Sequence, residues 1–401
     1  MIVQAQSVLH VLWILCNSAV FNLYQLAIYV LIRPFNRALY RKVMGAQCQQ
    51  AWVDVISCSF PESNIIATGD IPTDINKPMI ILANHQVDAD WWYLWQMARL
   101  QGAAGNVKIT LKGELKQVPI IGWGMQFFEF LFLKRSIEHD RLHVQGIPSF
   151  ICILELKRPA EEYMQSFLQD KFPFWMIIFP EGTTIHSEYV AKSRAFAAKT
   201  NRPTFEHLLL PRSTGLQIMM DAFSTDDVKP DIFDLTMAYP SYSGEVPTYA
   251  MGYGRNVDTE IPSMKSLVAG AGPSDVHIHS EKFSFDHVKQ LGVERFLDRQ
   301  WETKDKLLQE FIANQSFASK SASRCVIRPR SSVTAICRLW GAALASFFLL
   351  PLLLITVLPC YGLTVLYAAV MNSWDRRPTA FWPYLLNAVS ERQSAWKLKR
   401  P

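Results

Sequence analysis

The sequence predicts an α/β domain with a largely parallel sheet flanked by helices, together with an N-terminal membrane helix and a C-terminal membrane hairpin. Short apolar runs that end in turn residues alternate with longer stretches of helical character, which is the pattern of strands buried on both faces. Residues 9–32 contain no Asp, Glu, Lys or Arg. Residues 339–371 form a second apolar region, too long for one span and divided by Pro351, Pro359 and Gly362.

The expected strands are short apolar runs at 79–83, 107–111, 175–179, 208–210 and 235–239. Residues 275–283, DVHIHSEKF, alternate with period two, as a half-exposed strand does. His277 and His279 share one face of this strand, where we interpret them as solvent-facing side chains and not as metal ligands. Helical character is found at 138–170 and 213–223. Because open parallel sheets hold their sites at the carboxyl ends of strands, the polar residues that follow these runs are the site candidates.

The composition indicates contact with a membrane. Of the 401 residues, 50% are hydrophobic and 19% are charged, and this charged fraction is below the usual quarter of a soluble protein. The net charge of +5 suits anionic lipids or a phosphorylated ligand and does not call for nucleic acid. The seven cysteines are scattered without a CxxC pair, which indicates packing residues and not a disulfide framework or zinc site.

The N-terminal apolar segment is long enough to cross a bilayer, since 24 helical residues reach about 36 Å. Asn17, Asn22 and Gln25 interrupt it, so a helix that lies in the interface or packs against another helix is the alternative. Basic residues follow at once, and the positive-inside rule then places the next domain in the cytosol: Arg33, Arg37, Arg41 and Lys42. Positive charge on both sides of 339–371 likewise favours a hairpin with both ends in the cytosol.

The expected division of the chain follows from these segments. It consists of a membrane anchor at 1–45, a soluble domain at 46–315, a basic Ser/Arg-rich linker at 316–335, a membrane hairpin at 336–374 and a basic cytosolic tail at 375–401.

The first candidate site lies in LANHQVDADWWYLW, residues 82–95. His85 can act as a general base near neutral pH if a carboxylate fixes its tautomer. On a regular helix Asp88, at i+3, faces His85 better than Asp90, at i+5; if His85 precedes the first turn, Asp90 can reach it. Asp88 and Asp90 also resemble the Asp-x-Asp element of metal-dependent glycosyltransferases, and with His85 they can form a metal site. We interpret the aromatic residues that follow as core packing: Trp91, Trp92, Tyr93 and Trp95.

Two further stretches can bind a phosphorylated substrate. In FPEGTT, Glu181 can accept hydrogen bonds from a polyol, while Gly182 and Thr183 donate to a phosphate. In residues 111–136, Lys112 and Arg135 flank an apolar middle that can line an acyl channel. A guanidinium holds phosphate through two parallel hydrogen bonds, which makes Arg135 the preferred ligand. Arg212, in LPRSTG near an expected strand end, is another phosphate candidate.

Taken together, these motifs resemble the PlsC-type lysophospholipid or 1-acylglycerol-3-phosphate acyltransferase superfamily. Its His-x4-Asp motif is matched by NHQVDAD with His85 and Asp90, its Phe-x-x-Arg motif by Phe132 to Arg135, its third motif by FPEGT, and its proline-containing fourth motif by LLPRSTGL around Pro211. The runs IGWGMQF at 121–127 and LPRSTGLQ at 210–217 are similar to the branch that holds lysocardiolipin acyltransferase and its fungal relatives. The resemblance covers residues 75 to 315.

The resemblance implies acyl transfer from acyl-CoA to a free hydroxyl of a lysophospholipid at a bilayer, with neither a metal nor a further cofactor. His85 would remove the hydroxyl proton, Asp90 would orient His85, and Arg135 with Glu181 and Gly182 would position the glycerol phosphate. The other candidates around that phosphate are Phe132, Thr183, Lys112, Pro211 and Arg212. The expected location is the endoplasmic-reticulum membrane with a cytosolic active site, and lipid droplets or mitochondria are the alternatives.

Two other functions remain open from the residues alone. One is a metal-dependent membrane glycosyltransferase that uses Asp88 and Asp90. The other is a membrane scaffold that keeps the fold without turnover.

Overall fold

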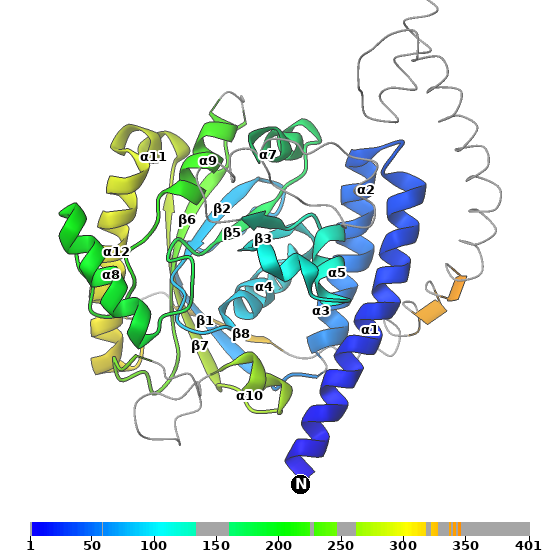
Figure 1. The fold of residues 1–401 in the computed structure, drawn as a ribbon, viewed down its shortest axis with the longest axis horizontal. Helices are drawn as coiled ribbons and strands as arrows, with labels where there is room; N and C mark the ends of the chain where they lie inside the picture. Colours follow the sequence, from blue (N-terminus) through cyan, green and yellow to red (C-terminus); the bar gives the residue numbers. More distant parts are fainter. Residues whose placement is uncertain are drawn as a thin grey trace, which may run out of the picture.

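The computed structural model describes residues 2–57, 59–133, 160–224, 228–246, 262–317, 322–327, 337, 340–341 and 344–345. An eight-stranded sheet forms its centre, in the order β4-β3-β5-β2-β6-β7-β1-β8 (Figure 1). The strands are β1 Ser63–Gly69, β2 Met79–Ala83, β3 Val107–Lys112, β4 Leu131–Leu133, β5 Trp175–Ile178, β6 Asp231–Ala238, β7 Asp275–Phe283 and β8 Ala322–Ile327. Neighbours from β4 to β6 are parallel, as are β7 and β1, whereas the pairs β6–β7 and β1–β8 are antiparallel. The predicted largely parallel α/β sheet is confirmed.

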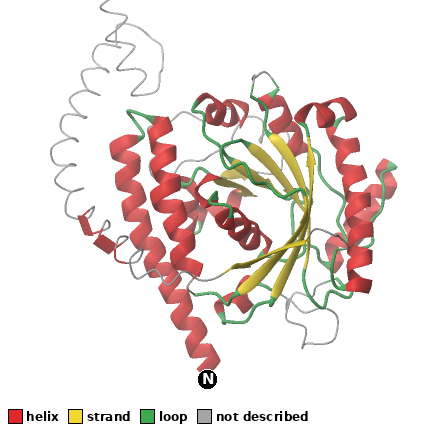
Figure 2. Cartoon of the chain, turned by 180° about the vertical axis from the view of Figure 1, so that it is seen from behind, coloured by secondary structure: helices red, strands yellow, loops and turns green. Residues whose placement is uncertain are grey.

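Helices cover both faces of the sheet (Figure 2). The N-terminal layer and the central helices are α1 Ile2–Ile32, α2 Arg37–Val43, η1 Met44–Gln49, α3 Gln50–Ser57, α4 Asp90–Leu100, η2 Ala104–Asn106, η3 Gly113–Gln117 and α5 Ile121–Phe127. The later helices are α7 Ala160–Gln169, α8 Ser187–Thr200, α9 Thr214–Phe223, α10 Met264–Val268, α11 Phe285–Leu291 and α12 Val293–Asn314. One large hydrophobic core joins the helices to the sheet. The N-terminal helices contribute Phe21, Tyr40 and Met44 to this core.

Most of the expected strands are present. The runs at 79–83 and 275–283 coincide with β2 and β7, while 107–111 and 175–179 differ from β3 and β5 by one residue at the end. The run at 235–239 is the second half of β6, which begins earlier, at Asp231. The predicted helix at 213–223 is α9. Of the helical stretch predicted at 138–170, residues 138–159 lie outside the described residues, and the remainder contains α7.

The strand expected at 208–210 is wrong. These leucines are buried, but their backbone hydrogen bonds go to side chains and not to a neighbouring strand. The N–H of Leu209 donates to the Glu181 carboxylate, and that of Leu210 donates to Ser193 Oγ. A short buried apolar run therefore does not distinguish a strand from a loop that packs under polar side chains.

The segment expected as a linker, 316–335, contains β8. Residues 322–327 pair antiparallel with β1, from Ser63 with Ile327 to Thr68 with Ala322. Without this pairing β1 would be an edge strand with a row of unpaired backbone groups. The predicted hairpin at 336–374 lies outside the described residues apart from five positions, and the tail at 375–401 lies wholly outside them.

Helix α1 contains a stretch, Val8–Ile32, that is long and apolar enough to cross a membrane by length and composition. Its polar side chains face the protein, where Asn17 and Gln25 are buried. Its exposed side chains are large and aliphatic instead: Val8, Leu9, Val11, Leu12, Leu23 and Leu31. The structure shows the alternative that the polar residues suggested, because α1 packs against another helix, α5. Asn22 Nδ2 donates to the carbonyl oxygen of Ile120, directly before α5, at 2.7 Å.

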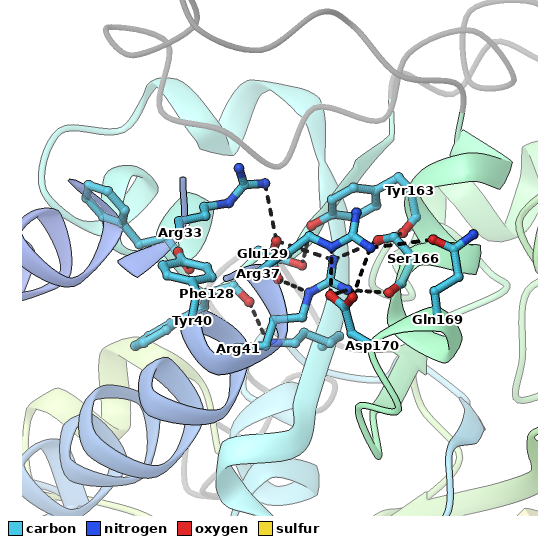
Figure 3. A network of polar contacts seen from close by, with 12 residues as sticks. Arg33, Arg37, Tyr40, Arg41, Phe128, Glu129, Tyr163, Ser166, Gln169 and Asp170 are labelled. Atoms are coloured by element: carbon cyan, nitrogen blue, oxygen red, sulfur yellow. Dashed lines mark hydrogen bonds and ion pairs between the residues drawn. The ribbon is translucent and has the colours of Figure 1, made fainter. Parts of the chain in front are cut away.

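The arginines after α1 form buried ion pairs with the central domain (Figure 3). Arg41 Nε donates to Glu129 Oε2 at 2.6 Å, and Arg33 Nη2 lies 3.6 Å from Glu129 Oε1. Arg37 and Arg41 both bind the Asp170 carboxylate, on the loop after α7. Three of the four charges that we counted toward membrane orientation are therefore committed to pairs within the protein.

Candidate active site

The His85–Asp90 pair lies at the carboxyl end of β2, in the middle of the sheet. Asn84 fixes this end, because its side chain donates to the Met237 carbonyl at 3.1 Å and accepts from the Met237 N–H at 2.7 Å. Helix α4 begins only at Asp90, so His85 precedes the first turn. His85 Nδ1 lies 2.8 Å from Asp90 Oδ2. The structure thus brings together the two residues that the family spacing pairs, and not the pair that helix periodicity favours.

The Asp90 carboxylate has further donors. The Val87 N–H donates to Oδ2 at 3.0 Å, and the Tyr239 hydroxyl donates to Oδ1 at 2.5 Å. Both Asp90 and Tyr239 are fully buried. Tyr239 follows β6, and the sequence analysis did not single it out as a site residue, although it ends the apolar run at 235–239. We assign it as a positioning residue for Asp90.

The imidazole of His85 is held from its other side by an aromatic ring. It stacks on Phe179 with a centroid separation of 4.3 Å and an interplanar angle of 23°. His85 lines a cavity, and its side chain is 17% exposed. Since Nδ1 bonds Asp90, and no hydrogen bond to Nε2 is present among the described residues, Nε2 is the nitrogen available to a ligand in that cavity.

Asp88 has a different partner from Asp90. Its Oδ1 accepts the Met264 N–H at 3.0 Å, at the start of α10, and burial raises the pKa of Asp88. Asp88 is therefore partly buried and binds the amino end of α10 instead of pairing with His85. In the described part of the chain no three His, Cys, Asp or Glu side chains are placed to hold a metal ion.

Glu181 connects three of the sequence motifs. Its Oε1 accepts the His85 N–H at 3.1 Å, and its Oε2 accepts the Leu209 N–H at 3.3 Å. Burial raises the pKa of this carboxyl to about 8, against the effect of the two backbone donors. Both oxygens thus hold the backbone of the site, which is a positioning role that the polyol-binding prediction did not include.

A cavity of about 550 Å³ opens beside His85. Its size lies in the range of ordinary ligand pockets. Most of the lining is apolar and comes from α1, α4, β3 and α5: Phe21, Trp91, Trp95, Ile109, Leu111 and Met125. Lys112, Gly182, Thr183 and Arg212 from the predicted set also line it.

Other predicted residues lie elsewhere. Phe132 is buried in the core, and the Pro211 carbonyl accepts a hydrogen bond from Arg202. Phe132, Pro211 and Glu181 are not among the residues that line the cavity. Arg135 lies outside the described residues. Residues of α1 that line the cavity, such as Asn22, were not predicted as site residues, because only the folded chain brings them to it.

Arg212 contributes a positive charge to the lining and lies against Gly182. Gly182 has φ of 73°, a left-handed conformation suited to glycine, and a Cβ there would lie 3.6 Å from Arg212 Nε. The Arg212 N–H donates to the Pro180 carbonyl at 2.8 Å, which fixes the loop, while the side chain is exposed at the cavity. This guanidinium is placed to meet an anionic group of a ligand.

The site thus combines an α/β sheet, a His–Asp pair at a strand end, a large apolar cavity and an arginine. Comparison with known proteins identifies the family. Residues 62–238 match the Acyltransferase family model, and residues 266–340 match the Acyltransferase C-terminus model. The chain therefore belongs to the acyltransferase family, which confirms the resemblance seen in its motifs.

Named relatives are moderately similar. A probable 1-acyl-sn-glycerol-3-phosphate acyltransferase 5 of Arabidopsis thaliana is 27% identical over 66% of this chain, and lysocardiolipin acyltransferase 1 of Danio rerio is 28% identical over 66%. The matched region spans 61% of the length of each. An uncharacterized acyltransferase of Saccharomyces cerevisiae is 30% identical over 60% of this chain and 61% of its own. The crystal structure of PlsC from Thermotoga maritima aligns with 78% of this chain and 98% of the PlsC chain. The TM-score of this alignment is 0.40 and the sequence identity is 16%.

Proposed function

We propose that this chain transfers a fatty acyl group from acyl-CoA to a free glycerol hydroxyl of a lysophospholipid, such as lysophosphatidate, with His85 as the general base. The observation that supports this most is the hydrogen bond from His85 Nδ1 to Asp90, which leaves Nε2 at the wall of an apolar cavity. The relatives named as lysophospholipid acyltransferases point to the same substrate class.

The proposed reaction needs one proton acceptor and no covalent enzyme intermediate. Nε2 of His85 takes the proton of the acceptor hydroxyl while its oxygen attacks the thioester carbonyl. The carbon–sulfur bond then breaks, the new ester forms, and the imidazolium returns the proton to the thiolate of CoA. Asp90 stabilises the imidazolium in between, since its carboxylate is 2.8 Å from Nδ1.

The apolar lining is proposed to hold the acyl chain, and the cationic lining to hold phosphate. Arg212 lies against Gly182 at the cavity, and Lys112 lines it from the end of β3. Either can bind the phosphate of the acceptor or of CoA by charge and hydrogen bonds. Arg135 stays a predicted phosphate ligand.

A membrane location belongs to the same proposal. Helix α1 exposes leucines and valines while it buries amide side chains, the reverse of a helix on a water-soluble protein. This pattern suits a lipid environment around part of α1. The endoplasmic reticulum and a cytosolic active site are our proposal for its position.

The test is an acyl-transfer assay on the purified full chain, with labelled acyl-CoA and a panel of lysophospholipids in vesicles. We expect labelled phospholipid and one free CoA thiol per ester formed, with the same rate in the presence of EDTA. Chelator-sensitive sugar transfer would instead favour a glycosyltransferase, although Asp88 and Asp90 bind different partners in this structure. A folded protein without any transfer would favour the scaffold.

Tyr239→Phe is expected to lower kcat about tenfold with little change in the KM for either substrate, because one of three hydrogen bonds to Asp90 is lost. The measurement is kcat and KM for both substrates from steady-state kinetics in vesicles, normalised to the amount of folded protein. A merely structural role for Tyr239 would lower the amount of folded protein and leave kcat per folded molecule unchanged.

Tyr93→Phe is the matched control. Tyr93 is buried next to Tyr239, with ring centroids 5.9 Å apart, but it donates no hydrogen bond to Asp90. Equal kinetic losses in the two variants would contradict the role assigned to Tyr239.

A further inference from the structure

The segment from η3 to α5, Gly113–Phe127, is fixed to the middle of α1. Asn22 Nδ2 donates to the Ile120 carbonyl oxygen at 2.7 Å, and Gln25 Nε2 donates to the Gly124 carbonyl oxygen at 3.3 Å. The contact is close at Gly124, where a Cβ would lie 3.0 Å from Asn22 Oδ1. Figure 1 shows α5 beside α1. The segment and the middle of α1 are therefore held together as one packed unit.

The outer side of the segment is apolar and aromatic. Leu115, Val118 and Trp123 are exposed by 36%, 41% and 38%. Lys116 belongs to the segment and Lys112, at the end of β3, directly precedes it, while Glu114 is an exposed acid between them. Aliphatic side chains beside tryptophan and lysine are the composition of elements that lie in the headgroup region of a bilayer, where lysines meet lipid phosphates.

The inner side of the same segment lines the cavity. Leu115, Ile120, Ile121 and Met125 contribute to the wall beside His85. Ile120 has φ of 66° and ψ of −65°, and the Ile121 N–H donates to the Pro119 carbonyl at 2.7 Å, which closes a γ-turn. A β-branched residue in this region is strained, and such strain concentrates at functional sites. The turn brings Ile120 into the wall next to Ile121, while Val118 and Trp123 stay on the outside.

We propose that Gly113–Phe127 is a second membrane-contact element, which dips into the lipid leaflet beside α1 and forms the wall through which a lipid substrate passes from the bilayer to the cavity. The occupant of its outer surface is a phospholipid bilayer that contains anionic lipids. Two observations support this partner: the segment is hydrogen-bonded to α1, whose exposed side chains are aliphatic, and its own large exposed side chains are apolar and stand next to the basic Lys112 and Lys116 in the sequence. The inference rests on the proposed function only in that the cavity receives a lipid.

The first test compares two acceptors with the double variant Val118→Glu/Trp123→Glu; neither residue lines the cavity. We expect activity on a long-chain lysophospholipid in anionic vesicles to fall about tenfold, because two acidic side chains oppose insertion. Activity on a short-chain, monomeric lysophospholipid should stay within about twofold of wild type, since the catalytic pair is untouched. Equal losses on both acceptors, or no loss on vesicles, would overturn the proposal.

The control variant also replaces one aromatic and one aliphatic side chain by glutamate, at two other exposed positions. Phe196 on α8 and Val228 before β6 are exposed by 54% and 60%. Phe196→Glu/Val228→Glu should keep wild-type activity on both acceptors. If it loses vesicle activity as the first variant does, the effect is one of added negative charge and the assignment fails.

A second test needs no turnover and so separates this inference from the proposed function. The wild-type chain in vesicles is irradiated with a phospholipid that carries a photoreactive group on its acyl chain. Crosslinked peptides from 113–127 and from α1, with none from α8, are the expected result. Crosslinks on α1 without any on 113–127 would refute the membrane contact, whatever the activity.

Discussion

Asp90→Asn is expected to lower the turnover of acyl transfer by about 10²- to 10⁴-fold, the usual contribution of a positioned general base. The Asp90 carboxylate accepts from His85 Nδ1, so Nε2 keeps its lone pair toward the cavity. An asparagine can turn its amide toward Nδ1 as a donor, which moves the ring proton to Nε2, the atom that must act as the base. The measurement is kcat and KM in vesicles, alongside the unfolding midpoint.

Asp88→Asn is the control two residues away. Asp88 accepts a hydrogen bond from the Met264 N–H, which an asparagine oxygen can also accept. We expect turnover within about threefold of wild type, as for substitutions outside the reacting groups. The opposite order, with Asp88→Asn inactive and Asp90→Asn active, would show that the wrong carboxylate has been assigned to His85.

The central strands and the position of the site were predictable because local sequence dictates them. A run such as 79–83 is apolar at every position and is followed by polar residues, so it reads as a buried strand with a site at its end. The partner of His85 does not follow from local sequence in the same way. Helix spacing alone favours Asp88, and the choice of Asp90 depends on where α4 begins, which is a feature of the folded chain.

Contacts between distant parts of the chain account for what the sequence could not show. The Tyr239 hydroxyl meets Asp90 across 149 positions, and Arg41 meets Glu129 across 88. Arg33, Arg37 and Arg41 follow an apolar helix as positive-inside residues do, yet their partners are carboxylates brought to them by α5 and α7. Local charge patterns cannot distinguish an arginine that faces lipid phosphates from one that is paired inside the protein.

Glu129→Gln is expected to destabilise the folded chain by about 3–5 kcal/mol, the usual cost of removing one partner from a buried ion pair. Glu129 is 2% exposed and follows α5, just before β4. Its carboxylate accepts Arg41 Nε at 2.6 Å and lies near Arg33 (Figure 3). The neighbouring Lys108 is also buried, and its Nζ donates to the Phe128 carbonyl at 2.6 Å. A glutamine keeps the shape but removes the negative charge that Arg41 and Arg33 share, so that Asp170 is the carboxylate left to Arg41.

The measurement is the free energy of unfolding of the purified chain in detergent, with Glu188→Gln as the control. Glu188 forms an exposed pair with Lys192 on α8, at 2.6 Å between Oε1 and Nζ. Exposed pairs of this spacing contribute less than about 0.5 kcal/mol, so this variant should unfold as wild type does. Similar small effects of both substitutions would mean that the arginines find water or other partners when Glu129 is neutral.

The pH dependence gives Glu129→Gln an independent signature. Burial opposes ionisation of Glu129, but the Arg41 and Arg33 guanidiniums and the Lys108 ammonium outweigh it and lower the pKa to about 2, from an ordinary value of 4.5. A carboxyl whose pKa is lowered by folding stabilises the folded chain fully above the unfolded value and loses this contribution as pH falls through the folded one. The stability difference between wild type and Glu129→Gln should therefore narrow steadily as pH falls from about 4.5 toward 2. A difference that stays constant through this range would mean that the carboxylate charge does not hold the N-terminal helices on the domain.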